Sequence, residues 1–464
     1  MTIIPNMLAE PAADSRPVHA LSKPELAGWL ATRTSSERSW LAAQRFKADA
    51  NQVALLPGAD GEPAGAVLGL GDRAEFWAFG ALPGNLPDGN YRIVTDLPPA
   101  LATRAALAFT LAHYQFARYR KAEPKAVKLL LPAGADAGYV ARAARAIGLA
   151  RDLINTPAED LGPAELAGAV GDLGRRHAAA VRQVVGEELL AQNYPAIHAV
   201  GRAAARPPRL VDLTWGEATH PKLTLVGKGV CFDTGGLDLK SAAGMLRMKK
   251  DMGGAATLIA LADMVMDAKL PVRLRLLVPA VENAVAGNAF RPGDVIRTRK
   301  GLTVEVGNTD AEGRIILCDA LAEADAEKPA LLIDVATLTG AARIALGPDL
   351  PALFTPDDAL AEDLLAQGRA ELDPLWRLPL HERYGDWLKS RVADLNNVSD
   401  GPFAGAITAA LYLQRFVEAT TAYAHIDSYA WIDDNRPGRP AGGEPLALRA
   451  LYALVVRRFG QAAP

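Results

Sequence analysis

The sequence predicts an α/β protein with a smaller N-terminal α/β domain and a larger C-terminal domain, in which helices flank a central, mostly parallel or mixed sheet. The chain has 464 residues, more than one typical domain contains. Short apolar runs alternate with helical stretches in its second part, as in proteins whose parallel sheet is covered on both faces. An Ala/Arg-rich helical run over 138–155 ends at Thr156-Pro157, because proline disfavours helix in the residue before it. We therefore expect a domain boundary near this run, with domains at 1–145 and 146–464.

The N-terminal part mixes strand-like and helical patterns between Gly/Pro turns. Its predicted elements are apolar runs at 52–56 and 66–70, a turn-rich segment at 82–90, a helix at 101–121 and a strand at 126–131. This part contains neither a Gly-rich phosphate motif nor a cluster of acids, so the candidate chemistry lies elsewhere.

The C-terminal part alternates strands with helices. The predicted strands are 223–226, 272–278, 303–306, 331–335 and 423–427, and the predicted helices are 253–267, 314–326, 358–370 and 404–419. Ligands of such folds bind at the carboxyl ends of strands, so polar residues that follow a strand are the candidates for a site.

Composition limits the possible functions. The formal net charge is −3, from 50 Lys and Arg against 53 Asp and Glu, which argues against a protein that coats nucleic acid. Two cysteines and seven scattered histidines allow no disulfide framework, no Cys-rich zinc site and no HExxH centre, so a metal site must consist mainly of carboxylates. The sequence has no apolar run of about twenty residues and no signal peptide, so we expect a cytoplasmic protein without membrane association.

The densest polar cluster follows the predicted strand 223–226 and reads VGKGVCFDTGGLDLK. Asp233 in this cluster precedes Thr-Gly-Gly, whose glycines let a ligand approach the backbone. Asp251 lies just before the Gly-Gly-Ala-Ala that opens a predicted helix, where the helix dipole favours a carboxylate. Each aspartate alone could equally be an ordinary turn or helix-start residue.

A second cluster, NTDAEGR, follows the predicted strand 303–306. Asp310, Glu312 and Arg314 alternate, and in an extended turn this spacing would point all three side chains to one side. Together with Asp233 and Asp251 they place four carboxylates at strand ends of one predicted sheet. Such a group needs cations or raised pKa values, and two divalent metals bridged by carboxylates are one established solution. The residues alone thus indicate an α/β enzyme, with a two-metal hydrolase as the sharper hypothesis.

These clusters and the segment MKKDMGGAA closely resemble the signature segments of the leucyl aminopeptidase (cytosol aminopeptidase) family of di-metal peptidases. Three further segments agree, namely RDLINTPAEDLGP at 151–163, DVATLTGAARIALG at 334–347 and NNVSDGPFAGAITAALYLQRFV at 396–417. The resemblance covers about residues 140–464 and identifies this part as a catalytic metallopeptidase domain. Residues 1–145 match the family's variable, macro-like N-terminal domain only in size and α/β character.

The resemblance implies a metalloexopeptidase that removes the N-terminal residue of peptides with water activated by two metal ions. Asp233 and Glu312 would bridge both ions, Lys228 and Asp251 would complete the tighter site, and Asp310 would hold the exchangeable ion. Lys228 can coordinate only as a neutral amine, so nearby dications must lower its pKa. Lys240 and Arg314 match the family's two catalytic cations.

The resemblance also implies cofactors, partners and a substrate pocket. The cofactors would be two divalent ions per subunit (Zn²⁺ or Mn²⁺, alternatively Mg²⁺ or Co²⁺), together with bicarbonate held by Arg314 as a proton shuttle. The substrates would be peptides with a free N-terminus, and the assembly a homohexamer. The positions around the substrate's first residue are Met248, Asn308, Thr337, Leu338 and Gly340.

Two features depart from the family pattern. After His425-Ile426-Asp427 the chain reads Ser428-Tyr429-Ala430-Trp431, and these bulky aromatic residues leave a preference for leucine open. Ala404-Gly405 stands where Gly-Gly is usual.

Two alternative functions remain. A two-metal phosphatase would need phosphate-binding backbone nests and more local basic charge. A DNA-binding role would need a basic surface, but acids interleave with the basic residues of the N-terminal part, so nucleic acid is an unlikely partner. Those basic residues are Arg104, Arg118, Arg120, Lys121, Lys125 and Lys128.

Overall fold

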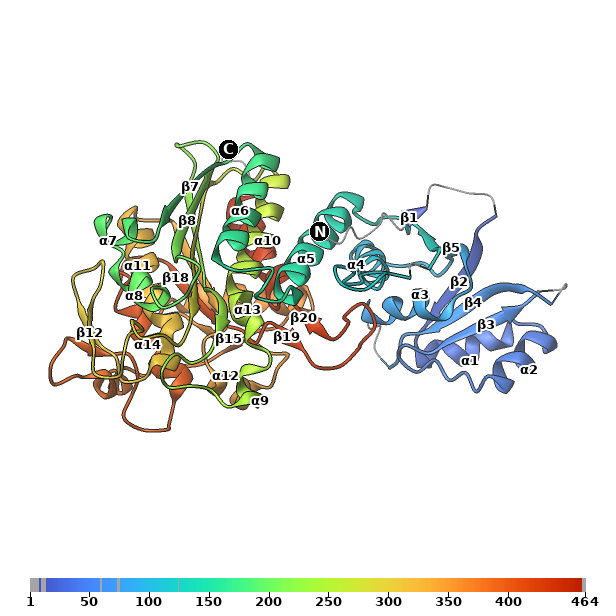
Figure 1. Cartoon of the computed structure of the whole chain (residues 1–464). Coiled ribbons are helices and arrows are strands. Elements are labelled where there is room, and N and C mark those ends of the chain that lie inside the picture. Colours follow the sequence, from blue (N-terminus) through green and yellow to red (C-terminus); the bar gives the residue numbers. More distant parts are fainter. Residues whose placement is uncertain (1–7, 10–13, 59–60, 73–75, 124, 461–464) are drawn as a thin grey trace. The chain divides into compact units, whose positions relative to one another are not determined.

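The computed structural model describes residues 8–9, 14–58, 61–72, 76–123 and 125–460. The chain divides into two compact units (Figure 1). The first unit comprises 1–148 and 432–441, and the second comprises 149–431 and 442–464. The segment 432–441 returns to the first unit late in the chain, which the expected domain ranges 1–145 and 146–464 do not include.

The first unit is built on a six-stranded sheet. Its strand order is β1 (Leu8–Ala9), β6 (Val127–Leu130), β5 (Gly89–Ile93), β2 (Arg16–Leu21), β4 (Pro63–Gly69) and β3 (Val53–Pro57). All neighbours pair in parallel except β3 and β4, which are antiparallel. The helices of this unit are α1 (Lys23–Ala31), α2 (Ser35–Ala43), α3 (Leu82–Asn85) and α4 (Pro99–Leu111), with a 3₁₀ segment η1 (Phe76–Ala81).

Both faces of this sheet are buried, as the alternation of side chains along β4 shows. Ala66 and Leu68 join the apolar core that includes Phe109 of α4, whereas Val67 joins a second core that includes Leu41 of α2. Helices therefore cover the sheet on both sides. From the late segment, the Arg439 guanidinium lies 5.3 Å from the centre of the Trp77 ring.

The predicted helix 101–121 is too long, because α4 ends at Leu111. The carbonyl of Phe109 lies 3.1 Å from Nδ1 of the His113 ring, while the His113 amide donates to Thr110 instead. The imidazole also lies 3.1 Å from the carbonyl of Val127 at its other nitrogen. The His113 ring therefore contacts the Phe109 carbonyl, which would otherwise accept the hydrogen bond of the next helical turn.

The second unit is built on a nine-stranded mixed sheet. The order is β16 (Trp376–Arg377), β15 (Ala352–Phe354), β18 (Tyr423–Asp427), β14 (Leu331–Ala336), β9 (Lys222–Gly227), β11 (Arg273–Asn283), β8 (Arg209–Trp215) and β7 (Ala180–Val185), and β10 (Gly229–Asp233) also pairs with β11. The central strands β18, β14, β9 and β11 run parallel, while β15, β8 and β7 pair with their inner neighbours in antiparallel fashion. The predicted mostly parallel or mixed sheet is therefore confirmed.

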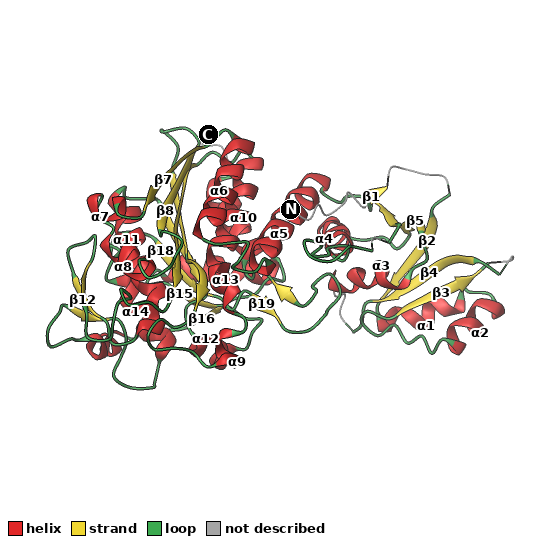
Figure 2. Cartoon of the chain, in the orientation of Figure 1, coloured by secondary structure: helices red, strands yellow, loops and turns green. Residues whose placement is uncertain are grey.

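Helices lie on both sides of this sheet (Figure 2). One layer contains α6 (Pro163–His177), α10 (Gly253–Asp267), α13 (Asp358–Ala370) and α15 (Leu448–Phe459), and the other contains α8 (Pro195–Gly201), α11 (Glu312–Ala326) and α14 (Gly405–Gln414). The remaining helical elements of this unit are α7 (Glu188–Ala191), α9 (Ala242–Met245) and α12 (Gly340–Leu346), with 3₁₀ segments η2 (Met248–Met252), η3 (Thr309–Ala311) and η4 (Glu382–Leu388). Helix α5 (Ala137–Asn155) begins in the first unit and ends in the second. No helix in the described ranges has the length and apolarity needed to cross a bilayer.

One predicted strand belongs to a different sheet. The strand at 303–306 is β13 (Thr303–Glu305), which pairs with β12 (Val295–Arg297) and β17 (Leu395–Asn396) in a small separate sheet. The expectation that all four candidate carboxylates follow strands of one sheet is therefore wrong. A further short pair, β19 (Trp431–Ile432) and β20 (Gly442–Gly443), completes the strands.

Candidate active site

The first half of the site lies at the carboxyl ends of β9 and β10. Lys228 is the single residue between these strands, and Asp233 ends β10. Both side chains are almost completely buried. Asn283, the last residue of β11, donates from Nδ2 to Asp233 Oδ1 at 2.9 Å and to the Thr309 carbonyl at 3.0 Å. Asn283 thus joins the strand-end aspartate to the segment that carries the other carboxylates.

Asp251 lies in η2, directly before α10. The helix packs closely on β14 at this point, because a Cβ on Gly254 would overlap the carbonyl of Val335. Thr337 Oγ1 donates to Asp251 Oδ1 at 2.7 Å, and the Thr337 carbonyl accepts from Lys228 Nζ at 2.9 Å. The small residues that open α10 therefore bring Asp251 to the ends of β9 and β14.

Asp310 and Glu312 do not lie in an extended turn. Asp310 is in the 3₁₀ segment η3 and Glu312 is the first residue of α11. Asn308 Oδ1 accepts from the Asp310 amide at 2.7 Å and so fixes this turn. Two residues along a helix differ by about 200° in direction, so Arg314 points away from Glu312. The predicted alignment of Asp310, Glu312 and Arg314 on one side is wrong for this reason.

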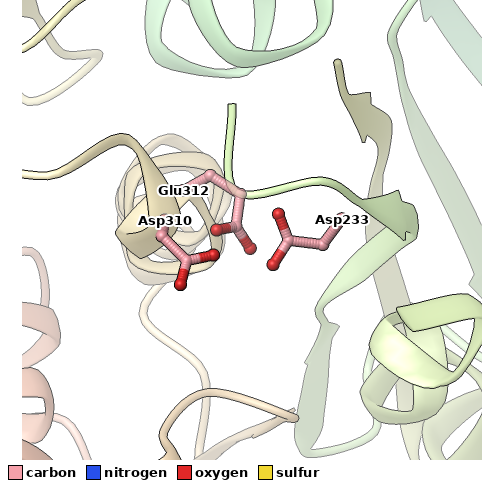
Figure 3. A group of neighbouring side chains, drawn as sticks. All are labelled: Asp233, Asp310 and Glu312. Atoms are coloured by element: carbon pink, nitrogen blue, oxygen red, sulfur yellow. The ribbon is translucent and has the colours of Figure 1, made fainter. Parts of the chain in front are cut away.

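Three carboxylates converge on one point (Figure 3). Asp233, Asp310 and Glu312 each offer one oxygen, and these oxygens all lie within 4.8 Å of one another. Two lysines accompany them. Lys228 Nζ lies 2.7 Å from Asp251 Oδ2 and 3.0 Å from Glu312 Oε1. Lys240 Nζ lies 2.8 Å from Asp233 Oδ2 and also contacts Asp310.

The electrostatics of the site show an excess of negative charge. Burial, together with the charge of Asp233, raises the pKa of Glu312 to about 8, and burial and Asp233 likewise raise the pKa of Asp310 to about 6. Burial opposes charge on Lys228, but the carboxylates of Asp251, Glu312 and Asp233 outweigh it and raise the pKa of that ammonium. Four carboxylates thus face two ammonium groups in a largely buried space.

This donor set fits divalent cations. Three buried oxygens, Asp251 Oδ2, Asp310 Oδ1 and Glu312 Oε1, have no polar partner among the described residues except the ammonium groups of Lys228 and Lys240. Carboxylate oxygens are ligands that Mg²⁺ and Mn²⁺ favour and that Zn²⁺ also accepts. The Lys228 nitrogen sits between two of the carboxylates, as a metal ligand would, but it can coordinate only after it loses its proton.

A pocket of about 250 Å³ opens onto the carboxylates and gathers most of the predicted residues. It is lined by Lys228, Asp233, Lys240, Met248, Asp251, Asp310, Glu312, Thr337, Leu338 and Gly340. Two predicted residues are not in its wall. Asn308 caps the η3 turn, and Arg314 is buried with Nη1 donating to the Asn397 carbonyl at 2.6 Å.

The pocket is also lined by Lys250, Thr339 and Arg343, which the sequence analysis did not single out. Ser428 and Tyr429, from the segment that departs from the family pattern, line it as well. Burial lowers the pKa of Lys250 to about 8. Lys250, Thr339 and Arg343 could have been found because they lie next to predicted site residues. Lys250 precedes Asp251, Thr339 lies between Leu338 and Gly340, and Arg343 lies one helical turn after Gly340.

Two residues outside the pocket wall hold it in shape. Asp427 Oδ1 accepts from the amides of Leu338 at 3.0 Å and Thr339 at 3.2 Å, and its Oδ2 accepts from the Thr339 hydroxyl at 2.6 Å. Asn283 likewise fixes Asp233 and Thr309, because its Nδ2 donates to the Asp233 carboxylate and to the Thr309 carbonyl. Asp427 is the last residue of β18 and Asn283 the last of β11, both in the central sheet. Because ligands bind at the carboxyl ends of such strands, their positions alone could have identified both residues.

The sequence is similar to known peptidases over most of its length. Residues 148–452 match the model of the cytosol aminopeptidase family, catalytic domain, and residues 16–132 match the model of the M17 aminopeptidase, N-terminal domain. A probable cytosol aminopeptidase of Stenotrophomonas maltophilia is 40% identical over 423 residues, which cover 86% of each chain. Peptidase B of Cronobacter sakazakii is 48% identical over 291 residues, 60% of this chain and 68% of the relative.

Solved structures give the same result. The cytosol aminopeptidase from Coxiella burnetii superposes with a TM-score of 0.93 at 48% identity, covering 97% of this chain and 98% of the other. The bottromycin maturation enzyme BotP, in a complex with Mn, superposes with a TM-score of 0.86 at 35% identity, covering 96% and 100%. The chain described here therefore belongs to the cytosol aminopeptidase family and is a peptidase, a hydrolase.

Proposed function

We propose that this peptidase is a metal-dependent aminopeptidase, which hydrolyses the N-terminal residue from peptides with water activated by two divalent metal ions. The observation that carries the proposal is the convergence of the Asp233, Asp310 and Glu312 oxygens within 4.8 Å in a site with more carboxylates than ammonium groups. The manganese complex of BotP, a relative in structure, supports the use of divalent metal.

Five residues would hold the two ions. Asp233 and Glu312 are proposed to contact both, Lys228 and Asp251 to complete the tighter site, and Asp310 to hold the exchangeable ion. When bound, such ions supply a hydroxide nucleophile at neutral pH and polarise the scissile carbonyl. Zn²⁺ and Mn²⁺ are the proposed occupants, with Mg²⁺ and Co²⁺ as alternatives. The free α-amino group of the substrate would also bind here, which confines cleavage to the first residue.

Lys240 is the proposed donor to the reacting carbonyl. Its ammonium is held by Asp233 and Asp310, and these carboxylates raise its pKa although burial opposes the charge. The charged ammonium can stabilise the oxyanion as the carbonyl is attacked, and it needs no reorganisation to do so.

Arg314 is the proposed holder of a bicarbonate ion, which would supply the general base. Arg314 Nε is buried and makes no hydrogen bond to the described residues. A guanidinium N–H in that state suits an anion. This arrangement would move the water proton to the leaving amine without a histidine.

The walls of the pocket would bind the first residue of the peptide. Met248, Thr337, Leu338 and Gly340 line it, and Asn308 supports it by capping the turn that carries Asp310. The predicted cytoplasmic location and homohexameric assembly stay predictions. Family membership favours this activity over the phosphatase alternative.

Hydrolysis of leucine p-nitroanilide tests the proposal. We expect a chelator to abolish activity and Mn²⁺ or Zn²⁺ to restore it, and Asp310→Ala to remove it. The matched control is Asp386→Ala, which removes an exposed carboxylate paired with Lys389 and should leave activity unchanged. Undiminished hydrolysis by Asp310→Ala, or by the chelated protein, would contradict the proposal.

A further inference from the structure

Asn397 lies next to the small sheet formed by β12, β13 and β17, and it does not line the pocket. It directly follows β17 and is fully buried. Its amide donates to the Glu305 carbonyl at 3.0 Å, which continues the pairing of β17 with β13 by one residue. β13 leads into the turn 307–311, which carries Asp310. The small sheet therefore brings Asn397 against this turn, although 90 positions of sequence separate it from Gly307.

The side chain of Asn397 makes four hydrogen bonds to described residues, and all four end on the backbone of the turn 307–311. Oδ1 accepts from the amides of Gly307 at 2.8 Å and Asn308 at 3.2 Å. Nδ2 donates to the carbonyls of Asn308 at 2.7 Å and Ala311 at 3.4 Å. A carboxamide has two acceptor positions and two donor hydrogens, so these bonds use its full capacity. Asn397 is therefore matched to one conformation of this turn.

The turn and the end of β17 approach each other closely at a glycine. A Cβ on Gly307 would lie 2.4 Å from Asn396 Oδ1 and 2.8 Å from a methyl group of Val398, so a larger residue would hold the two segments apart. Inside the turn, Asn308 Oδ1 accepts from the Asp310 amide at 2.7 Å. Asn397 thus fixes Asn308, and Asn308 fixes Asp310.

The backbone of Asn397 contacts a second group of the proposed site. Its carbonyl accepts from Arg314 Nη1 at 2.6 Å, and Arg314 is buried. Among the described residues the guanidinium makes no other hydrogen bond, so this contact orients it. Asn397 therefore contacts both the turn that carries Asp310 and the guanidinium of Arg314, which lie on either side of Glu312 in the sequence.

We propose that Asn397 is a positioning residue of the active site, which fixes Asp310 and Arg314 in one arrangement around Glu312. This inference rests on the proposed two-metal function. Through the turn, Asn397 sets the position of the carboxylate that would hold the exchangeable ion. Through its carbonyl, it orients the guanidinium that would hold bicarbonate. Removing a residue that orients a metal ligand without touching the metal commonly changes metal affinity by about 10–100-fold.

Calorimetric titration of the metal-free protein with MnCl₂ tests the inference. Asn397→Ala removes all four side-chain bonds, and we expect it to weaken the lower-affinity binding step by about 10–100-fold. The higher-affinity step should be unchanged, because Lys228, Asp233 and Asp251 lie on other segments. A general loss of stability would not select one of the two steps, so this split separates positioning from a purely structural role.

The response to bicarbonate gives a second readout, which concerns Arg314. In bicarbonate-depleted buffer with saturating Mn²⁺, leucine p-nitroanilide hydrolysis is followed as bicarbonate is added. The concentration that gives half of the full activation should rise about tenfold in Asn397→Ala, because a displaced carbonyl no longer orients the guanidinium. An unchanged concentration would overturn the part of the inference that concerns Arg314.

The matched control is Asn396→Ala. Asn396 is the same type of residue at the preceding position, and its side chain accepts from the Val398 amide at 3.0 Å rather than from the turn. Both Mn²⁺ affinities and the bicarbonate response of this variant should equal those of the wild type. Urea unfolding of the metal-free variants measures any loss of stability separately.

Equal weakening of both Mn²⁺ steps in Asn397→Ala, or no change in either step, would overturn the inference. If Asn397→Ala does not fold, Asn397→Ser takes its place, because a hydroxyl can replace one of the lost bonds. Failure of both variants to fold would show that Asn397 is structural and would overturn the inference as well. A wild-type protein that binds fewer than two Mn²⁺ ions would instead contradict the proposed function. The two failures are therefore distinguishable.

Discussion

The two compact units of this protein bury different kinds of residue. Among the described residues of the first unit, the buried polar side chains are those of Ser15 and Thr110, and none is charged. The second unit buries charged groups both at its pocket and elsewhere, including Lys228, Glu312 and Asp334. Both units are α/β structures with helices on both faces of a sheet.

This difference separates two tasks that the same fold class can serve. An apolar interior stabilises a unit without committing it to any ligand. A charged interior costs stability unless partners compensate it, and the pocket of the second unit contains more carboxylates than ammonium groups. The stability and activity of the second unit should therefore depend on pH and metal in a way that the first unit does not share.

The largest expected effect compares two lysines that each pair with two aspartates. Lys240 pairs with Asp233 and Asp310 in the pocket, whereas Lys23 lies 2.8 Å from Asp49 and 3.5 Å from Asp72 on the surface of the first unit. Lys240→Met should lower kcat for leucine p-nitroanilide by about 10²–10³-fold, the usual effect of losing one donor to a developing oxyanion.

Lys23→Met is the control and should leave kcat unchanged, because exposed ion pairs contribute little. Steady-state kinetics of both variants with saturating Mn²⁺ make the comparison. Equal effects of the two substitutions would show that the buried lysine is structural only.

The second effect concerns a charge buried in the central sheet of the second unit. Asp334 of β14 is fully buried, accepts from the Tyr423 hydroxyl at 2.7 Å and lies 2.7 Å from His425 Nδ1. This carboxylate raises the pKa of His425 although burial opposes it. Asp334→Ala leaves the imidazolium without its partner and should lower the free energy of unfolding of the second unit by about 3–5 kcal/mol.

Urea unfolding of the metal-free protein measures this loss. The first unit provides the internal control, because hydrogen exchange of its β2 and β4 amides should be unaffected. A loss below about 1 kcal/mol would mean that His425 gives up its proton at little cost.

The third effect is an opposite pH dependence of the two units in the metal-free protein. The raised pKa values of Glu312 (about 8) and Asp310 (about 6) mean that the folded second unit holds protons that the unfolded chain has released. Its stability should therefore be highest near pH 5 and decrease as the pH rises to about 8. In the first unit, burial lowers the pKa of His19 and His113, so the unfolded chain takes up protons first and stability decreases as the pH falls below about 6.5.

Calorimetry of the metal-free protein between pH 5 and pH 8.5 resolves these slopes. Glu312→Gln, which cannot titrate, should flatten the slope of the second unit and leave that of the first unchanged. Metal should also bind more tightly as the pH rises, because Glu312 and Lys228 must both lose protons. A second unit that gains stability between pH 5 and pH 8 would contradict the charge distribution described here.

The sequence predicted well those elements whose pattern is local. The helix at 253–267 was predicted with its correct bounds, because nearly every residue of α10 is buried and its small first residues mark where it begins. The strands at 223–226, 331–335 and 423–427 lie within β9, β14 and β18, where continuous apolar runs are typical of a central parallel sheet. The aspartates that follow such strands were candidates for the same reason.

Features that depend on distant residues could not be predicted in this way. The η3 turn that carries Asp310 is fixed by Asn308 and by Asp238, whose Oδ2 accepts from the Thr309 amide at 2.7 Å across 71 positions of sequence. The short strands of the small sheet carry too few residues for a periodic pattern. Lys250 and Arg343 line one pocket although they lie 93 positions apart, and neither is unusual in its own segment.

The smallest expected effect compares one hydroxyl in each unit. Tyr423 of the second unit donates to the charged Asp334, while Tyr91 of the first unit donates to the neutral carbonyl of Pro87 at 2.9 Å. The Tyr91 hydroxyl also accepts a longer bond of 3.3 Å from Arg16, which water can replace because Arg16 is partly exposed. Both side chains are almost completely buried. Tyr423→Phe should cost about 1.5–3 kcal/mol and Tyr91→Phe about 0.5–1.5 kcal/mol, because a hydrogen bond to a charged group is the stronger one and its loss leaves a buried carboxylate less solvated. Hydrogen exchange of the β18 and β5 amides measures the loss of stability caused by each substitution in the same experiment. Equal costs would show that His425 alone satisfies Asp334, and the contrast between a charged and an apolar interior would then be confined to the pocket.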